Sequence, residues 1–176
     1  MRQIVIAFVA ACTLVGCSPV VEPPPPPPTV EETPSGPVFT EKEQAVIDAV
    51  DRYLERLIQI GRDPVGEDWN TIREVAWDPA ANNALIVYRA MLENGWHTEG
   101  ETAFAPRTVM ESWADHQGQR FDVYGCQAAE GPLVVDSDGN PVSHHEFEKT
   151  AYRYEVVRTP DGRFFVTQEI SGEKQC

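Results

Sequence analysis

Six consecutive prolines, Pro23 to Pro28, divide the chain into a short leading part and a longer remainder. Proline has no amide hydrogen and a fixed φ angle, so this run joins neither a helix nor a sheet and stays extended. The flanking residues add glutamates and almost no bulky apolar side chain, so residues 17–37 cannot bury a core. We expect a semi-rigid spacer here and one folded domain over residues 38–176. The alternative role of the spacer is to bind a proline-reading domain.

The leading part has the layout of an export signal. Arg2 supplies a short positive start, and residues 4–15 form an almost wholly apolar stretch. That stretch is shorter than the roughly 20 residues that a membrane-spanning helix needs, which favours a signal peptide. We therefore expect residues 1–16 to be a cleaved signal.

The end of this stretch, Leu14-Val15-Gly16-Cys17, resembles the lipobox of bacterial lipoprotein precursors. The resemblance implies that Cys17 becomes the first residue of the mature protein and carries a thioether-linked diacylglycerol. Two acyl chains anchor a protein stably to a membrane, whereas one chain is marginal. The protein would then be lipid-anchored at the extracytoplasmic face of the cell membrane. The alternative is an ordinary signal peptide, cut near Gly16, that leaves Cys17 as a free thiol.

The charge of the chain excludes two classes of contact. The chain has 14 Lys and Arg against 28 Asp and Glu, a formal net charge of -14. Nucleic acids and anionic lipid headgroups are bound through basic surfaces, so we expect no nucleic-acid partner and no basic contact with the membrane. Of the acidic residues, Glu22, Glu31 and Glu32 lie in the spacer, so the acidic excess belongs to the folded domain.

Two cysteines, Cys126 and Cys176, fall in the folded domain. An even number of cysteines in an exported domain predicts a disulfide. It would close a loop of about 50 residues and contribute roughly 4 kcal/mol by restricting the unfolded chain. The alternative is two free thiols. Neither cysteine has another Cys or a His at the spacing of a metal ligand.

The first half of the domain has helical signals. Thr40 followed by Glu43 forms a capping box, and apolar residues recur behind it at helical spacing as far as Gly61. Asp78 before Pro79 is typical of an N-cap with proline at the first helical position. We expect three helices, over residues 41–61, 68–76 and 79–93, the third with an inner side formed by Leu85, Tyr88 and Leu92.

From Trp96 onward, apolar and polar residues alternate with a period of two, which is typical of strands. Helices first and antiparallel strands later predict an α+β domain, with the helices packed on one face of a curved antiparallel sheet. We expect strands over residues 96–102, 107–114, 119–127, 133–135, 149–158 and 163–170.

The strand-rich half contains these segments: Phe121-Asp122-Val123-Tyr124-Gly125-Cys126, Val134-Val135-Asp136 with Asp138-Gly139, Tyr152-Arg153-Tyr154-Glu155-Val156-Val157, Pro160-Asp161-Gly162-Arg163-Phe164-Phe165-Val166 and the final Cys176. In these segments the chain resembles small actinobacterial lipoproteins with a nuclear-transport-factor-2-like or cystatin-like cone fold. The resemblance covers about residues 95–176 and implies a disulfide between the two cysteines. It transfers no catalytic residue and no cofactor to this chain.

A cone fold encloses a pocket between its sheet and its helices, and some proteins of this fold are isomerases or dehydratases. Such chemistry needs a carboxylate or His in an apolar cavity, with a hydrogen-bond donor near the reacting group. Asp122 and Tyr124 share one strand face, and Glu111 and His97 lie on neighbouring strands. Because this pattern is more typical of a solvent-facing strand, we assign no catalytic residue. The side chains that could line the pocket, unless they simply fill the core, are Trp69, Trp77, Tyr88, His97, Trp113 and Tyr124.

Two segments have the residue types of a metal site without its geometry. His144 and His145 stand beside two glutamates, but adjacent residues rarely direct their side chains to one ion. Residues 136–140 partly resemble a calcium loop, yet Phe147 stands where the loop needs a bidentate Glu. A β-turn explains that segment. We expect no metal ion and no cofactor.

The sequence thus predicts a membrane-anchored extracytoplasmic lipoprotein whose domain binds a small ligand or an envelope protein and is not an enzyme. The alternative is a cone-fold enzyme of the isomerase or dehydratase type, with an Asp or His and a Tyr in its pocket. A buried carboxyl or His that faces a Tyr and is reached by water favours the enzyme. An exposed apolar patch of several hundred Å² favours a protein partner.

Overall fold

The computed structural model describes residues 37–101, 103–128, 133–142 and 149–176. The signal, Cys17 and almost all of the spacer lie outside these residues, as do His144 and His145. The chain divides into two units, residues 1–35 and 36–176, and everything described below belongs to the second. None of the helices in the described ranges combines the length and the apolar character needed to cross a membrane.

Helix α1 (Glu41–Arg62) begins at the predicted capping box. Oγ1 of Thr40 accepts a hydrogen bond from the Glu43 amide at 3.3 Å, and the Thr40 amide donates one to Glu43 Oε2 at 2.7 Å. Gly61 does not end the helix but lies in its last turn, where Thr98 packs so closely that a Cβ atom would collide with it. The buried side of α1 consists of Val46, Ile47, Ala49, Val50, Tyr53, Leu54, Ile58, Ile60 and Gly61.

A short 3₁₀ helix, η1 (Trp69–Glu74), precedes helix α2 (Ala80–Asn94). The expected cap of α2 by Asp78 is wrong, because Pro79 occupies the N-cap position and no side chain caps this end. The Asp78 carboxylate instead accepts a hydrogen bond from Arg73 Nη1 at 3.2 Å.

The inner side of α2 also differs from the expected one. Tyr88 is buried, but Leu92 is 44% exposed. Leu85 is partly buried and packs against the core, as expected. A row of alanines lets this helix approach the core closely, so the fully buried stripe follows the alanines. The stripe consists of Ala80, Ala81, Ala84, Tyr88 and Met91.

The strands form two antiparallel sheets. The larger sheet has the order β2-β3-β5-β6, and the smaller one pairs β1 with β4. Strand β5 has the predicted bounds, whereas β2 begins earlier and β6 ends later than expected. The strands are β1 (His97–Glu99), β2 (Phe104–Asp115), β3 (Gly118–Ala128), β4 (Leu133–Val135), β5 (Lys149–Arg158) and β6 (Phe164–Gln175).

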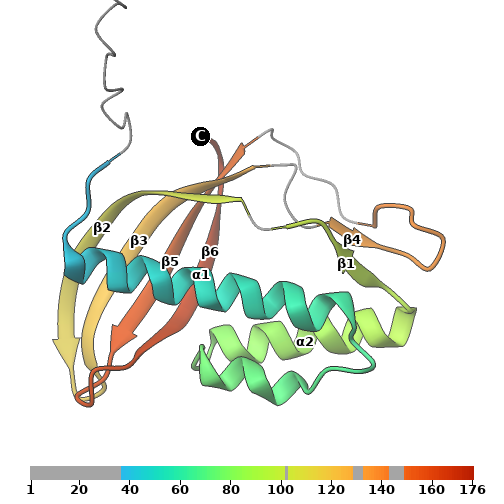
Figure 1. Ribbon diagram of the computed structural model, residues 1–176, viewed down its shortest axis with the longest axis horizontal. Coiled ribbons are helices and arrows are strands. Elements are labelled where there is room, and N and C mark those ends of the chain that lie inside the picture. Colours follow the sequence, from blue (N-terminus) through green and yellow to red (C-terminus); the bar gives the residue numbers. More distant parts are fainter. Residues whose placement is uncertain (1–36, 102, 129–132, 143–148) are drawn as a thin grey trace, which may run out of the picture. The chain divides into compact units, whose positions relative to one another are not determined.

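Helix α1 runs across one face of the curved larger sheet, and α2 lies beside α1 (Figure 1). The core lies between these layers, with Val46 and Val50 from α1 packed in one cluster with Phe121, Val123 and Tyr154 from the sheet. The fold is therefore the predicted α+β arrangement, with helices on one face of an antiparallel sheet.

A disulfide joins Cys126, near the end of β3, to the final residue Cys176, with Cα atoms 6.0 Å apart. The expected pairing is thus present in the structure. Because β5 lies between β3 and β6, the bond links β3 to the residue that follows β6, across β5.

Candidate functional site

A cavity of about 400 Å³ lies between the two α-helices, the small sheet and strands β5 and β6. Its wall is mostly apolar, and Glu169 is the one acidic side chain among the described residues that form it. The wall contains no Lys, Arg or His among the residues that the structure describes. The lining residues are Tyr53, Leu57, Ile58, Ala80, Asn83, Ala84, Val87, Tyr88, Met91, Thr98, Val134, Tyr152, Glu169 and Ser171.

Glu169 projects from β6 to the helix-covered side of the sheet. Its Oε2 accepts a hydrogen bond from the Tyr53 hydroxyl of α1 at 3.0 Å. Burial raises the pKa of the Glu169 carboxyl, and the hydrogen bond from Tyr53 acts in the opposite direction. Glu169 therefore keeps its proton to a higher pH than an exposed glutamate, at a position that a molecule in the cavity would touch.

Four tyrosines lie around this carboxyl: Tyr53, Tyr88, Tyr152 and Tyr154. The ring of Tyr154 is edge-on to Tyr53 at 6.3 Å and stacked on Tyr152 at 6.0 Å. Burial, and after it the charge of Glu169, raises the pKa of all four phenols, so they remain protonated at neutral pH. The Tyr88 hydroxyl donates to a backbone carbonyl of α1 at 3.1 Å. The buried Tyr154 hydroxyl has no hydrogen-bond partner in the described part of the chain.

Sequence reasoning missed Glu169 because an irregularity in the β5–β6 pairing reverses the alternation of β6. Val166 and Glu169 both lie on the helix-covered side, although they are three residues apart. One extra residue in a strand moves every later side chain to the other face. Strict alternation from the buried Val166 would have placed Gln168 inside instead.

Of the aromatic residues expected in the pocket, Tyr88 lines the cavity, whereas Trp69 and Trp77 do not. Nε1 of Trp69 donates a hydrogen bond to the Pro64 carbonyl at 2.7 Å, and its ring centroid lies 6.4 Å from that of Tyr88. Trp77 stacks on Phe165 at 4.8 Å. Trp69 therefore packs behind the cavity residue Tyr88 and Trp77 packs against Phe165, and neither indole contributes to the cavity wall.

The other three residues expected in the pocket also lie elsewhere. His97 pairs with Glu99 at 3.3 Å, and its neighbour Thr98 faces the cavity instead. Trp113 is 55% exposed and Tyr124 is 37% exposed. Val123, the residue before Tyr124 on β3, points into the core. Because side chains alternate along a strand, Tyr124 points to the helix-free face.

The acids considered for catalysis are likewise engaged outside the cavity. Asp122 accepts a hydrogen bond from Arg153 Nη1 at 3.4 Å on the helix-free face. Glu111 on β2 forms an ion pair with Lys42 of α1 at 2.5 Å. Neither lines the cavity, so none of the expected acid, His and Tyr combinations lies in it; Asp122 and Tyr124 share one strand face, as expected, but it is the helix-free one.

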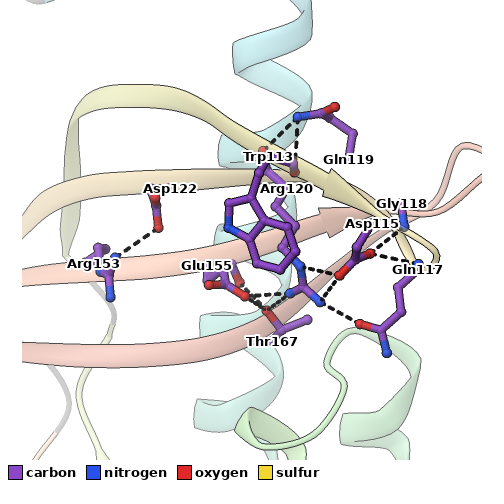
Figure 2. Close-up of polar contacts among 10 residues, drawn as sticks. All are labelled: Trp113, Asp115, Gln117, Gly118, Gln119, Arg120, Asp122, Arg153, Glu155 and Thr167. Carbon is purple, nitrogen blue, oxygen red and sulfur yellow. Dashed lines mark hydrogen bonds and ion pairs between the residues drawn. The ribbon is translucent and has the colours of Figure 1, made fainter.

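A second polar cluster surrounds Arg120 on β3 (Figure 2). Its Nη1 donates to Glu155 Oε1 at 2.5 Å, and Nε and Nη2 donate to Asp115 Oδ2 at 3.2 Å. Nη2 also donates to Gln117, and the Trp113 ring lies 4.9 Å from the guanidinium (Figure 2). Every nitrogen of this guanidinium has an acceptor within the protein, which marks a structural cluster rather than a binding site.

In the turn at residues 136–140, which partly resembles a calcium loop, the Asp136 carboxylate binds backbone amides of the same turn. Oδ1 of Asp136 accepts hydrogen bonds from the amides of Asp138 and Asn140, both at 2.9 Å. These bonds, that from Asn140 foremost, lower the pKa of Asp136. Within the described ranges, no three His, Cys, Asp or Glu side chains gather in a way that could hold a metal ion.

The comparisons with known proteins inform the fold alone. No protein-family model matches the sequence, and no curated protein matches it. The intermembrane space region of the chloroplast protein ARC6 is similar in structure, with a TM-score of 0.57 and 13% identity over 77% of this chain and 98% of that one. An iota-carbonic anhydrase from a cyanobacterium, complexed with bicarbonate, has a TM-score of 0.39 and 13% identity over 79% of this chain and 98% of that one. The first of these likenesses supports the α+β fold.

Proposed function

We propose that this protein is a lipoprotein, anchored through Cys17 to the extracytoplasmic face of the cell membrane, whose domain binds a small, mostly apolar molecule. The observation that carries the binding role is the cavity with the Glu169 carboxyl in its wall. Small-molecule sites are typically cavities of roughly 300–1,000 Å³ with apolar walls and a few placed polar groups. The cavity of about 400 Å³ has this form.

The nuclear-transport-factor-2-like cone belongs to the same proposal. In such a cone a curved sheet and its helices enclose a pocket, and the supporting features are α1 lying across the curved sheet (Figure 1) and the cavity between helices and strands. The exposed large apolar side chains of the described residues are spread over several elements: Ile86, Val87 and Leu92 on α2, Met110 and Trp113 on β2, Tyr124 on β3, and Val38, Val65 and Val142 outside helices and strands. This scatter over several elements favours a small ligand over one large protein partner.

Filling the cavity tests this function. Ala84 is buried and lines the cavity, so Ala84→Phe would occupy the space. Ala114→Phe, at an exposed position on β2, adds the same side chain elsewhere. In ligand-observed NMR with a set of small apolar molecules, we expect binders to be lost with the first variant and retained with the second. Binding that survives Ala84→Phe unchanged would rule out the cavity as the site.

One observation favours the cone-fold enzyme as a second candidate: a carboxyl with a raised pKa lies among tyrosines in an apolar cavity. Glu169, in place of the expected Asp or His, would remove a proton from a carbon next to a carbonyl, and the Tyr152 hydroxyl would donate to the carbonyl oxygen. We rank it second because the Tyr53 hydroxyl donates its hydrogen bond to Glu169 itself and so already occupies Oε2 of that carboxyl. Protein-dependent uptake of deuterium from D₂O by small ketones, lost in Glu169→Gln, would place it first.

A further inference from the structure

We propose that the cavity selects a small organic cation, an amine bound as its ammonium ion, with the ammonium against Glu169 and the apolar part among the aliphatic residues of α1 and α2. This inference rests on the proposed binding function and names the chemical class of its ligand.

The charge of the wall is the first argument. Glu169 is the one acidic side chain of the lining, and no described Lys, Arg or His faces it there. The arginines of the same sheet lie on its opposite face, where Arg120 has two acidic partners and Arg153 has one. A buried carboxylate is costly unless a positive charge and hydrogen bonds compensate it. The Tyr53 hydroxyl supplies a hydrogen bond to Oε2 but no charge, so a cation from outside would complete the site.

The aromatic surroundings are the second argument. Tyr53, Tyr88 and Tyr152 all contribute to the wall that contains Glu169. The faces of aromatic rings attract ammonium groups, most strongly where water is excluded. A carboxylate together with tyrosine rings therefore suits an ammonium ion better than it suits an anion or a neutral hydroxyl.

The remaining residues of the wall indicate that the other part of the ligand is apolar. Leu57, Ala84, Val87 and Met91 offer aliphatic surface from the two helices. A molecule with one amine and an apolar body about the size of a phenyl ring would match this division between a charged corner and an apolar remainder.

The pH dependence of binding separates this ligand class from its nearest rival, a neutral carbonyl compound that would accept a hydrogen bond from protonated Glu169. Ammonium binding strengthens as the pH rises through the pKa of Glu169, because the carboxylate forms. Carbonyl binding weakens over the same interval. The titratable groups that face Glu169 are Tyr53 from α1, Tyr88 from α2, and Tyr152 and Tyr154 from β5, and all four stay neutral there.

The test uses calorimetric titration of the full chain with 2-phenylethylamine, 2-phenylethanol and phenylacetate, which share one apolar body. We expect the amine to bind roughly tenfold or more tightly than the alcohol, as charge-assisted hydrogen bonds imply, and phenylacetate not to bind. Glu169→Gln should remove the advantage of the amine over the alcohol. Glu111→Gln, which removes the same charge outside the cavity, should change neither affinity and thus controls for general attraction to an acidic protein.

Three results would overturn the inference: equal affinities for amine and alcohol, equal losses in the two Gln variants, or amine affinity of the unaltered chain that falls as the pH rises. The last measurement needs no variant, so it holds even where a substitution disturbs folding. If amine and alcohol bind equally and Ala84→Phe prevents both, the cavity binds small molecules without selecting cations. If none of the three probes nor any molecule of the NMR set binds, the proposed binding function itself fails.

Discussion

The Tyr53 hydroxyl donates a hydrogen bond to the Glu169 carboxylate at 3.0 Å across 116 residues of sequence. The bond joins α1 to β6 and holds the carboxyl in the wall of the cavity. It also favours the ionised form of the carboxyl, whereas burial favours the protonated form. The protonation state of Glu169 therefore depends on the balance between this hydrogen bond and burial.

Removing this hydrogen bond should raise the pKa of Glu169 further. In Tyr53→Phe the ring and its packing against Tyr154 remain, but the donor is lost. We expect a higher pKa for Glu169 and a loss of about 1–3 kcal/mol of unfolding free energy where the carboxyl is ionised. A ¹³C NMR titration of the carboxyl measures the pKa. Tyr88→Phe is the control, since the Tyr88 hydroxyl bonds to the Leu57 carbonyl, and an equal shift there would contradict the prediction.

Glu169 should make the domain less stable as the pH rises. The pKa of Glu169 in the folded chain lies above its unfolded value of about 4.3. Its contribution to the free energy of unfolding is therefore complete below the unfolded pKa and is lost as the pH rises through the folded pKa. Glu169→Gln should therefore be more stable than the unaltered protein by about 1 kcal/mol near pH 8 and by less near pH 5.5. Urea unfolding at the two pH values measures this. A variant less stable than the parent at both would refute the sign.

The Arg120 cluster should contribute to stability but not to ligand binding. Arg120→Ala leaves Asp115 and Glu155 without their shared cation, and we expect a loss of about 3 kcal/mol, since the Arg120 side chain is only 10% exposed. Arg153→Ala is the matched control, because its pair with Asp122 is more exposed and should be worth less than about 1 kcal/mol. Denaturant unfolding compares them, and equal losses would mean that burial does not govern these pairs.

The anchor predicts a change of location. Cys17→Ala removes the atom that would carry the lipid, so the protein should move from the membrane fraction to the soluble fraction or the medium. Fractionation followed by immunoblotting measures the shift, with Cys176→Ala as a control that should leave the protein in the membrane fraction. A Cys17→Ala protein that stays with the membrane would show that the lipobox resemblance misleads.

The elements that could be predicted from sequence depend on residues close together along the chain. The capping box of Thr40 and Glu43 and the apolar stripe behind it act within a few turns, so α1 forms where expected. The bounds of β5 follow from a local alternation of apolar residues between turn signals. The order of helices before strands was enough for the α+β arrangement, because each element must bury its apolar face against another.

The site depended on pairings that no local pattern contains. Glu169 enters the cavity because β6 pairs with β5 through an irregular register, and the hydroxyl that binds it comes from the other end of the domain. Trp77 lies outside the cavity because Phe165 is available to stack on it. The existence of strand β6 was thus predictable from sequence. Which side chains of β6 face the helices was not predictable. A shift of one residue in the pairing costs little in local energy and exchanges every side chain between the core and the solvent.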